Sequence, residues 1–139
     1  MIFAALVGWL IYTTMTSKLP SGSGQGPQKR TKEEFFNLFI TAYNKVETCG
    51  IPYQLAYAVS AAETGYGNGN VFQNSRNLFS ILCSPSWKGE CYRGRPNSLT
   101  ANPLGDSHRV YPDYESSIGD WVRLMRTPHY AQAYQAAVA

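Results

Sequence analysis

Hydrophobic positions recur with helical spacing in four stretches of the chain between residues 31 and 139. The first stretch follows Thr31 and Glu34, which have the spacing of a capping box. Its apolar positions are Phe35, Leu38, Phe39, Ala42 and Val46. This spacing predicts an amphipathic helix that ends near Cys49 and Gly50.

A second helix is expected from Pro52 to about Thr64, because proline suits the first turn and three glycines follow closely. Residues 71–109 are rich in Gly, Pro, Asn and Ser, and their short apolar pieces at 78–82 and 109–111 predict a small hairpin. Two further helices are predicted after the N-cap residues Asp113 and Thr127. The expected fold class is therefore α+β and mostly helical, with one domain over residues 31–139.

The first residues have a different pattern. Residues 1–17 carry no charged side chain, and residues 2–12 are almost wholly apolar. Residues 18–30 form a Gly/Ser/Pro linker. The apolar segment is either an uncleaved membrane-anchor helix or a cleaved signal peptide, and the missing basic start and poor small-residue exit favour the anchor. Basic residues follow the segment, which by the positive-inside rule would hold the domain in the cytoplasm or inside a membrane-containing virus particle.

Composition narrows the function classes. The 139 residues are 44% hydrophobic and 14% aromatic, which excludes disorder throughout. The formal charge of +3 comes from 12 basic and 9 acidic residues, but Lys18, Lys29 and Arg30 precede the domain. The domain itself is formally neutral and has no basic stripe, so we expect no nucleic-acid partner.

The cysteines and histidines predict no cofactor. Cys83 and Cys91 flank residues 84–90, a loop that a disulfide could close in an oxidising compartment, and Cys49 is left over. No C-x-x-C motif occurs, and His108 and His129 lack neighbouring ligands, so no metal site is expected. The chain also has no glycine loop of the phosphate-binding kind.

One carboxylate has an unusual place in the second helix. Leu55, Val59, Ala62 and Glu63 share one helical face, which puts Glu63 on or beside the stripe expected to face the core. Burial there would desolvate the carboxylate and raise its pKa, as suits a general acid. In the alternative interpretation, Glu63 swings off the helix end and stays solvated.

Several motifs follow in order around this residue. They are AAETGYG at 61–67, NLFSI at 77–81, WKG at 87–89, HRVYPDYESSIGDW at 108–121 and TPHYA at 127–131. This series resembles the glucosaminidase family known as glycoside hydrolase family 73, which includes a flagellar muramidase-like domain and bacterial autolysins. The resemblance covers about residues 33–134.

The resemblance implies a lysozyme-like fold with a small β-hairpin lobe and cleavage of the glycan strands of peptidoglycan. Glu63 would be the catalytic acid, and Tyr130 would orient substrate or stabilise the cationic transition state. Asn77 and Phe79 match the motif of the cleft floor, while Trp87 and Tyr111 are candidates to contact sugar. Each of these four also has a structural interpretation, as a turn-former, a core residue or hairpin packing.

The chain departs from the family pattern at the second acid. Residues 98–101, where the resemblance places a hairpin carboxylate, contain none, and the segment offers only Glu90 and Asp106. Either could reach the cleft or be a solvated loop charge. Without a second acid, the substrate's own N-acetyl group could act as nucleophile, or a lytic transglycosylase reaction could form a 1,6-anhydro ring. A non-catalytic wall-binding or assembly module is the alternative from another class.

The expected setting is a membrane-anchored glycosidase at the periplasmic face of the cell envelope or in a virion membrane. Its expected partners are peptidoglycan, the membrane through residues 1–17, and assembly partners in a virion or envelope machine. Residues 76–109 carry a local charge excess that could attract the anionic wall. Its five basic residues are Arg76, Lys88, Arg93, Arg95 and Arg109, and its two acidic residues are Glu90 and Asp106.

Overall fold

The computed structural model describes residues 29–93 and 107–139, so the predicted anchor and almost all of the predicted linker lie outside the described residues. The helices are α2 (Lys32–Tyr43), α3 (Tyr53–Thr64), α4 (Asn70–Ser75), α5 (Tyr114–Met125), the 3-10 turn η1 (Pro128–Tyr130) and α6 (Ala131–Val138). Strands β1 (Cys91–Arg93) and β2 (Ser107–Arg109) pair antiparallel, with Cys91 opposite Arg109. The predicted mostly helical α+β class is confirmed. No helix in the described ranges is long and apolar enough to cross a membrane.

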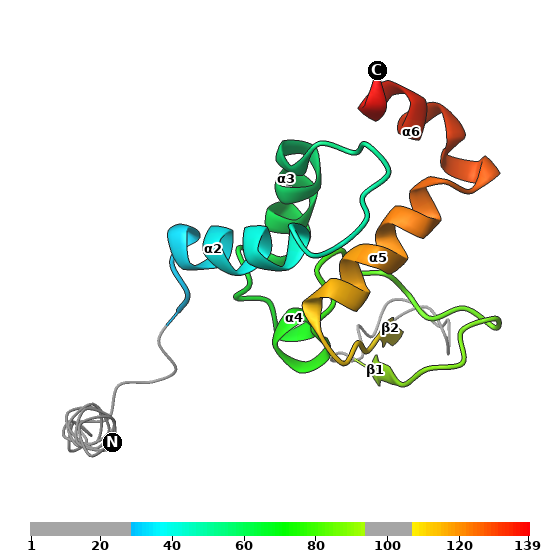
Figure 1. Ribbon diagram of the computed structural model, residues 1–139. Helices are drawn as coiled ribbons and strands as arrows, with labels where there is room; N and C mark the ends of the chain where they lie inside the picture. Colours follow the sequence, from blue (N-terminus) through cyan, green and yellow to red (C-terminus); the bar gives the residue numbers. More distant parts are fainter. Residues whose placement is uncertain (1–28, 94–106) are drawn as a thin grey trace, which may run out of the picture.

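The small sheet lies at one end of the helical part, next to the first turns of α5 (Figure 1). The buried core is formed mainly where α2, α3 and α5 meet, and Phe35, Phe39 and Ile118 are each fully buried there. Phe79 stacks on Trp121 of α5 with ring centroids 4.4 Å apart, which joins the loop after α4 to this core. The core therefore fixes the end of α3 and the 77–82 segment in one body.

The first helix is shorter than its periodicity predicts. The capping box at Thr31 and Glu34 is present, but α2 ends at Tyr43, and residues 44–46 continue as a turn. Val46 still packs against the core from that turn, where its N–H donates to the Tyr43 carbonyl. The apolar position of Val46 therefore fits the helical spacing in the sequence although the residue lies in a turn.

The stretch after α3 differs more. Residues 70–75 form the short helix α4, where irregular structure was predicted. The helix has no periodic apolar pattern, because Phe72 is its one buried hydrophobic side chain. Residues 78–82 were expected to contribute to the hairpin, but only Leu82 makes a bridge, to His108. The preceding residues turn back around the buried side chain of Asn77 instead.

The turn after α3 carries three consecutive residues with positive φ, namely Gly65, Tyr66 and Gly67. Thr64 closes this turn, because its hydroxyl donates to the Ser60 carbonyl and accepts from the Gly67 N–H. Asn68 then binds both backbone groups of Arg30, accepting from its N–H at 2.8 Å and donating to its carbonyl at 3.0 Å. The chain before α2 is thereby fixed to the turn that follows α3.

We expect alanine at Gly67 to cost clearly more stability than alanine at Gly65. Both residues have positive φ, which costs a non-glycine residue roughly 1–2 kcal/mol. A Cβ at Gly67 would also lie 2.7 Å from the Phe35 ring, whereas a Cβ at Gly65 would meet nothing within 4 Å. Urea unfolding of the two variants measures the difference, and equal losses would mean that the contact with Phe35 relaxes freely.

Candidate active site

Glu63 lies in the last turn of α3 and is exposed. The buried residues of the helix are Ala56, Ser60, Ala61 and Thr64, which form a different face from the one expected. The prediction that Glu63 is desolvated against the core is therefore wrong. The alternative interpretation, a solvated carboxylate at the helix end, describes its position.

The apolar stripe that shares a face with Glu63 borders an open groove. Leu55 and Val59 line a hollow of about 540 Å³ between α3 and α6, and Leu55 is 38% exposed. A second hollow of about 350 Å³ is lined by residues 79–82. The two hollows share Trp121, Met125 and Tyr130 and therefore adjoin, and together they are called the groove below. Glu63 follows Val59 by one helical turn and therefore lies on the groove side of α3.

A hydrogen bond connects the floor of the groove to the residue that carries the carboxylate. Ser80 has a φ of 51°, and its hydroxyl donates to the Glu63 carbonyl at 3.3 Å. Ser80, Phe79 and Ile81 all line the groove. The loop after α4 therefore holds the end of α3 in place, a role that the sequence analysis did not assign to Ser80.

Asn77 is fully buried, so it has no surface to offer a sugar. Its amide nitrogen donates to the carbonyls of Ile81 and Arg109, and its carbonyl oxygen accepts from the N–H groups of Ile81 and Phe79. The structure thus favours the turn-forming interpretation of Asn77 over direct contact with substrate. Phe79 is 6% exposed and combines core packing with a place at the groove wall.

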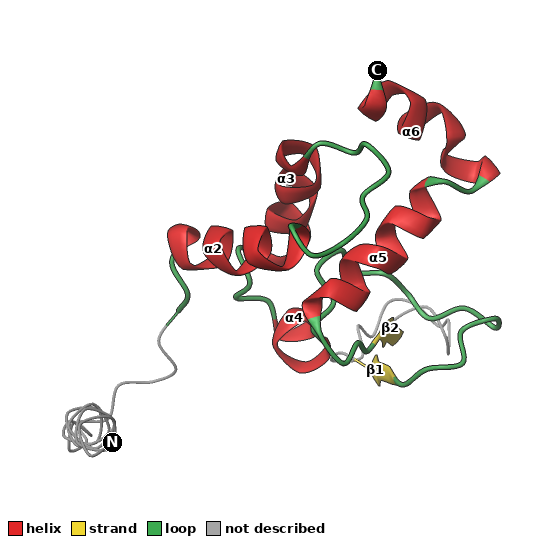
Figure 2. Ribbon diagram, viewed as in Figure 1, coloured by secondary structure: helices red, strands yellow, loops and turns green. Residues whose placement is uncertain are grey.

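Tyr130 lies on η1 and is 44% exposed, although it lines both parts of the groove. Its ring and the ring of His129 are nearly perpendicular, with centroids 4.7 Å apart. A short loop connects the end of α5 to η1, and α6 follows η1 directly (Figure 2, helices in red and loops in green). This path brings Tyr130 to the same groove as the exposed face of α3.

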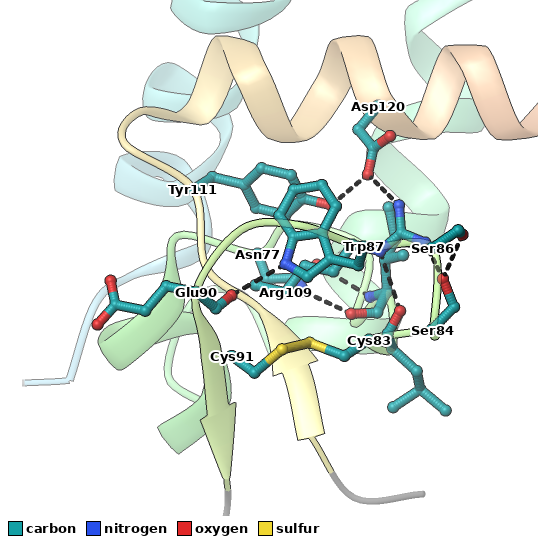
Figure 3. Close-up of a disulfide and its surroundings, with 12 residues drawn as sticks. Asn77, Cys83, Ser84, Ser86, Trp87, Glu90, Cys91, Arg109, Tyr111 and Asp120 are labelled. Atoms are coloured by element: carbon teal, nitrogen blue, oxygen red, sulfur yellow. Dashed lines mark hydrogen bonds and ion pairs between the residues drawn. A yellow bond between two sulfur atoms is a disulfide. The ribbon is translucent and has the colours of Figure 1, made fainter. Parts of the chain in front are cut away.

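Trp87 and Tyr111 lie elsewhere, on the other side of α5, where they surround the buried pair Arg109 and Asp120 (Figure 3). Arg109 Nη1 binds Asp120 Oδ2 at 2.7 Å, and the Tyr111 hydroxyl donates to the same oxygen at 2.6 Å. The Trp87 ring covers the Arg109 guanidinium at 4.7 Å. Tyr111 is 3% exposed, so the structure places it as a support and not as a groove-lining side chain.

The electrostatics of this cluster follow from its contacts. Burial alone would raise the pKa of Asp120. The hydrogen bonds from Tyr111, Arg123 and Arg109 together lower this pKa by more than burial raises it, so it lies below its usual range. Burial and the bond to Asp120 raise the pKa of Tyr111, which keeps its hydroxyl a donor. The cluster therefore holds a carboxylate in its charged form between α5 and strand β2.

Arg109 also reaches the segment that forms the groove floor. Its Nε donates to the Leu82 carbonyl at 3.0 Å, and its backbone N–H donates to the Ile81 carbonyl at 2.9 Å. This role of Arg109 was not evident from its motif. Asp120, between the buried residues Ile118 and Trp121 of α5, was the available signal that a buried cation lies opposite.

Neither candidate for the second acid is placed at the groove. Glu90 is exposed and borders the hollow on the far side of α5, together with Trp87 and Asp120. That hollow shares no lining residue with the groove, since α5 stands between them. Asp106 lies outside the described residues.

Cys83 and Cys91 are joined by a disulfide, which closes the loop that carries Trp87 (Figure 3). Cys49, the third cysteine, is free. We expect the Cys83→Ser variant to lose about 2–3 kcal/mol of unfolding free energy, because opening this short loop restores freedom to the unfolded chain. Urea unfolding measures the loss, with Cys49→Ser as the matched control, and equal stability of the two variants would contradict the expectation.

Comparisons with known proteins identify a family and several relatives of this chain. The family model described as mannosyl-glycoprotein endo-beta-N-acetylglucosaminidase matches residues 39–139. The peptidoglycan hydrolase FlgJ of Salmonella typhimurium is 29% identical over 130 residues, which are 88% of this chain and 41% of that protein. The Escherichia coli O157:H7 protein of the same name is 33% identical over 110 residues, 73% of this chain and 35% of that protein.

The fold has a solved counterpart in the glycoside hydrolase domain of Salmonella typhimurium FlgJ. The similarity has a TM-score of 0.59 at 27% identity, and it covers 78% of this chain and 70% of that one. The chain spans about two fifths or less of the two full-length relatives. The family model, in contrast, matches almost the whole described domain, and the resemblance read from the motifs is confirmed. The chain belongs to the glucosaminidase family.

Proposed function

We propose that this chain is a peptidoglycan hydrolase that cleaves the glycan strands of the bacterial cell wall as an endo-β-N-acetylglucosaminidase. The observation that carries the proposal is the place of Glu63, an exposed carboxylate on the groove side of α3, within a chain that the glucosaminidase model matches over residues 39–139. The relatives named peptidoglycan hydrolase support the choice of substrate.

In this mechanism the glycan strand lies in the groove over Trp121, Met125 and Tyr130. Glu63 in its protonated form donates a proton to the glycosidic oxygen as the bond to the sugar breaks. The bound strand itself covers Glu63 and excludes water, so the carboxyl becomes desolvated in the complex and not in the free protein. Tyr130 faces the same groove, where its hydroxyl can orient the sugar and its ring can stabilise the positive charge that develops.

The fate of the sugar cation depends on a nucleophile that the described residues do not supply at the groove. Glu90 borders the other hollow. Asp106, the other candidate, lies outside the described residues. In a reaction with one protein acid, the N-acetyl group of the substrate or its own 6-hydroxyl attacks the anomeric carbon. Attack by the N-acetyl group followed by water gives hydrolysis, whereas attack by the 6-hydroxyl gives a 1,6-anhydro ring and defines a lytic transglycosylase.

One experiment tests the function and separates these reactions. The full chain, in mild detergent, is incubated with purified sacculi, and the ends of the released fragments are identified by mass spectrometry. We expect new reducing N-acetylglucosamine ends. Reducing N-acetylmuramic acid ends would identify a muramidase instead, and anhydro-muramic ends a transglycosylase. Binding to sacculi without release would support a non-catalytic wall-binding module and overturn the proposal.

The setting that fits this activity is the cell envelope, with the domain tethered to a membrane by residues 1–17. The support is the uncharged apolar segment followed by a Gly/Ser/Pro linker. Fractionation of cells that produce the full chain, with and without residues 1–17, tests the tether. Equal release of both chains into the soluble fraction would contradict it.

A further inference from the structure

A third hollow lies against another face of α5, outside the groove, and nothing in the proposed reaction uses it. Its volume is about 670 Å³, in the range of small-ligand sites. Its walls are one face of α5, which contributes Gly119, Asp120 and Arg123, and the disulfide-closed loop with Trp87 and Glu90. Figure 3 shows the Trp87 and Tyr111 rings between the loop and α5.

The charges around this hollow are of both signs. Asp120 is already satisfied, because Arg109 and Tyr111 bind one of its oxygens and Arg123 binds the other through Nε at 3.0 Å and Nη2 at 2.5 Å. The remaining charged side chains are Arg76 and Arg123 on the cationic side and Glu90 on the anionic side.

These three side chains keep hydrogen-bonding capacity. The one hydrogen bond that the Arg76 side chain makes within the described residues is a long one, 3.4 Å from Nη1 to the Tyr111 carbonyl. The Arg123 side chain is 62% exposed, and a guanidinium has more N–H donors than Asp120 uses. The carboxylate of Glu90 has no hydrogen-bond or ion-pair partner in residues 29–93 and 107–139, and Figure 3 shows it directed away from the cluster.

Two guanidinium groups and a separate carboxylate are complementary to a ligand that carries both a free carboxylate and a free ammonium group. Resting on the proposed function, we infer that this hollow binds the peptide stem of peptidoglycan, whose free ends and diamino-acid residues carry such groups. Arg76 and Arg123 would hold the carboxylate, and Glu90 would hold the ammonium.

The dimensions of the parts allow this arrangement. The groove and the hollow border different faces of one helix, α5, and a helix with its side chains is about 10–12 Å across. An extended peptide stem of about five residues reaches ~17 Å. A stem attached to a sugar in the groove can therefore pass around α5 and place its charged end in the hollow.

Direct binding tests the inference without relying on cleavage. The full chain carrying Glu63→Gln is titrated calorimetrically with a soluble stem peptide that ends in a diamino acid, and with versions amidated at the carboxylate or acetylated at the amine. We expect either blocking group to weaken binding about tenfold, as for one lost charge-assisted hydrogen bond. Equal affinity for all three peptides, or no binding of the free peptide, would overturn the inference.

Arginine substitutions locate the binding to this hollow. The double variant Arg76→Gln, Arg123→Gln should weaken binding of the free peptide at least tenfold. The matched control is Arg126→Gln, which removes an exposed charge from the C-cap residue of α5, whose side chain lies outside the hollow. Thermal unfolding confirms that both proteins are folded, and unchanged affinity in the folded double variant would contradict the assignment.

Activity distinguishes this inference from the proposed function. With the natural chain, KM should be several-fold lower for intact glycan strands than for strands whose peptides an amidase has removed. The double variant should lose this preference through KM while keeping its kcat. If neither strand type is cleaved, the proposed function fails, and the binding result above still decides on the hollow. If both are cleaved with equal KM by the natural chain, the inference fails and the proposed function stands.

Discussion

Glu63→Gln is expected to reduce the release of glycan fragments from sacculi by about a hundred- to ten-thousandfold, the range that a general acid contributes. Glutamine keeps the size of the side chain but has no proton to donate to the glycosidic oxygen. Because Glu63 is exposed, its replacement should change the unfolding free energy by no more than about 0.5 kcal/mol. Fragment release measured by mass spectrometry and thermal unfolding together check both parts.

The matched control for this variant is Glu33→Gln, the same chemical change at an exposed glutamate in the first turn of α2. It should retain full activity. Full activity of the Glu63 variant would remove the central residue of the proposed mechanism. Loss of activity in both variants would point to a general effect of charge on wall binding, and a drop in melting temperature of the Glu63 variant alone would point to a structural role.

The second large effect concerns stability. Asp120→Ala should lower the unfolding free energy by about 3–5 kcal/mol, because it leaves the Arg109 guanidinium buried without its counter-charge. The side chains of this pair are only 7% and 10% exposed. Arg123→Ala removes another partner of the same carboxylate, but from a side chain that is 62% exposed, and should cost less than about 1 kcal/mol. Urea unfolding measures both losses, and similar values would contradict the role given to burial.

The same carboxylate predicts how stability depends on pH. The folded-state pKa of Asp120 lies below its unfolded value of about 3.9, so its contribution is fully present above that value. The contribution is lost as the pH falls through the folded-state pKa. The natural chain should therefore lose stability steeply below about pH 4, and the Asp120→Ala variant should show a shallower slope over that range.

The class of fold is predictable from the sequence because strong local signals determine most of the helices. The capping box at Thr31 and the N-cap at Asp113 both form as expected. The end of α2 and the helix α4 could not be predicted from periodicity, because Val46 packs from a turn and α4 buries a single aromatic ring. In both places the secondary structure is determined by packing against the core, and the local sequence pattern does not specify it.

The candidate site shows a related limit. Periodicity correctly placed Leu55, Val59 and Glu63 on one face of α3, but it could not tell whether that face meets the core or an open groove. Small residues supply the core-facing side instead, since Ala56, Ser60 and Ala61 allow close approach. The motif positions of Trp87 and Tyr111 likewise suggested contact with sugar, whereas their rings pack around Arg109 and Asp120.

The bonds between Arg30 and Asn68 have a mechanical consequence. Arg30 is fixed through its backbone to Asn68 and through Nη1 to the Gly67 carbonyl at 2.9 Å, so a pull on the preceding chain acts on the turn directly after Glu63. Residues 18–28 can extend over at most about 36–40 Å. If residues 1–17 are held in a membrane, that length sets a fixed working radius, and strands of the wall beyond it are out of reach of the groove.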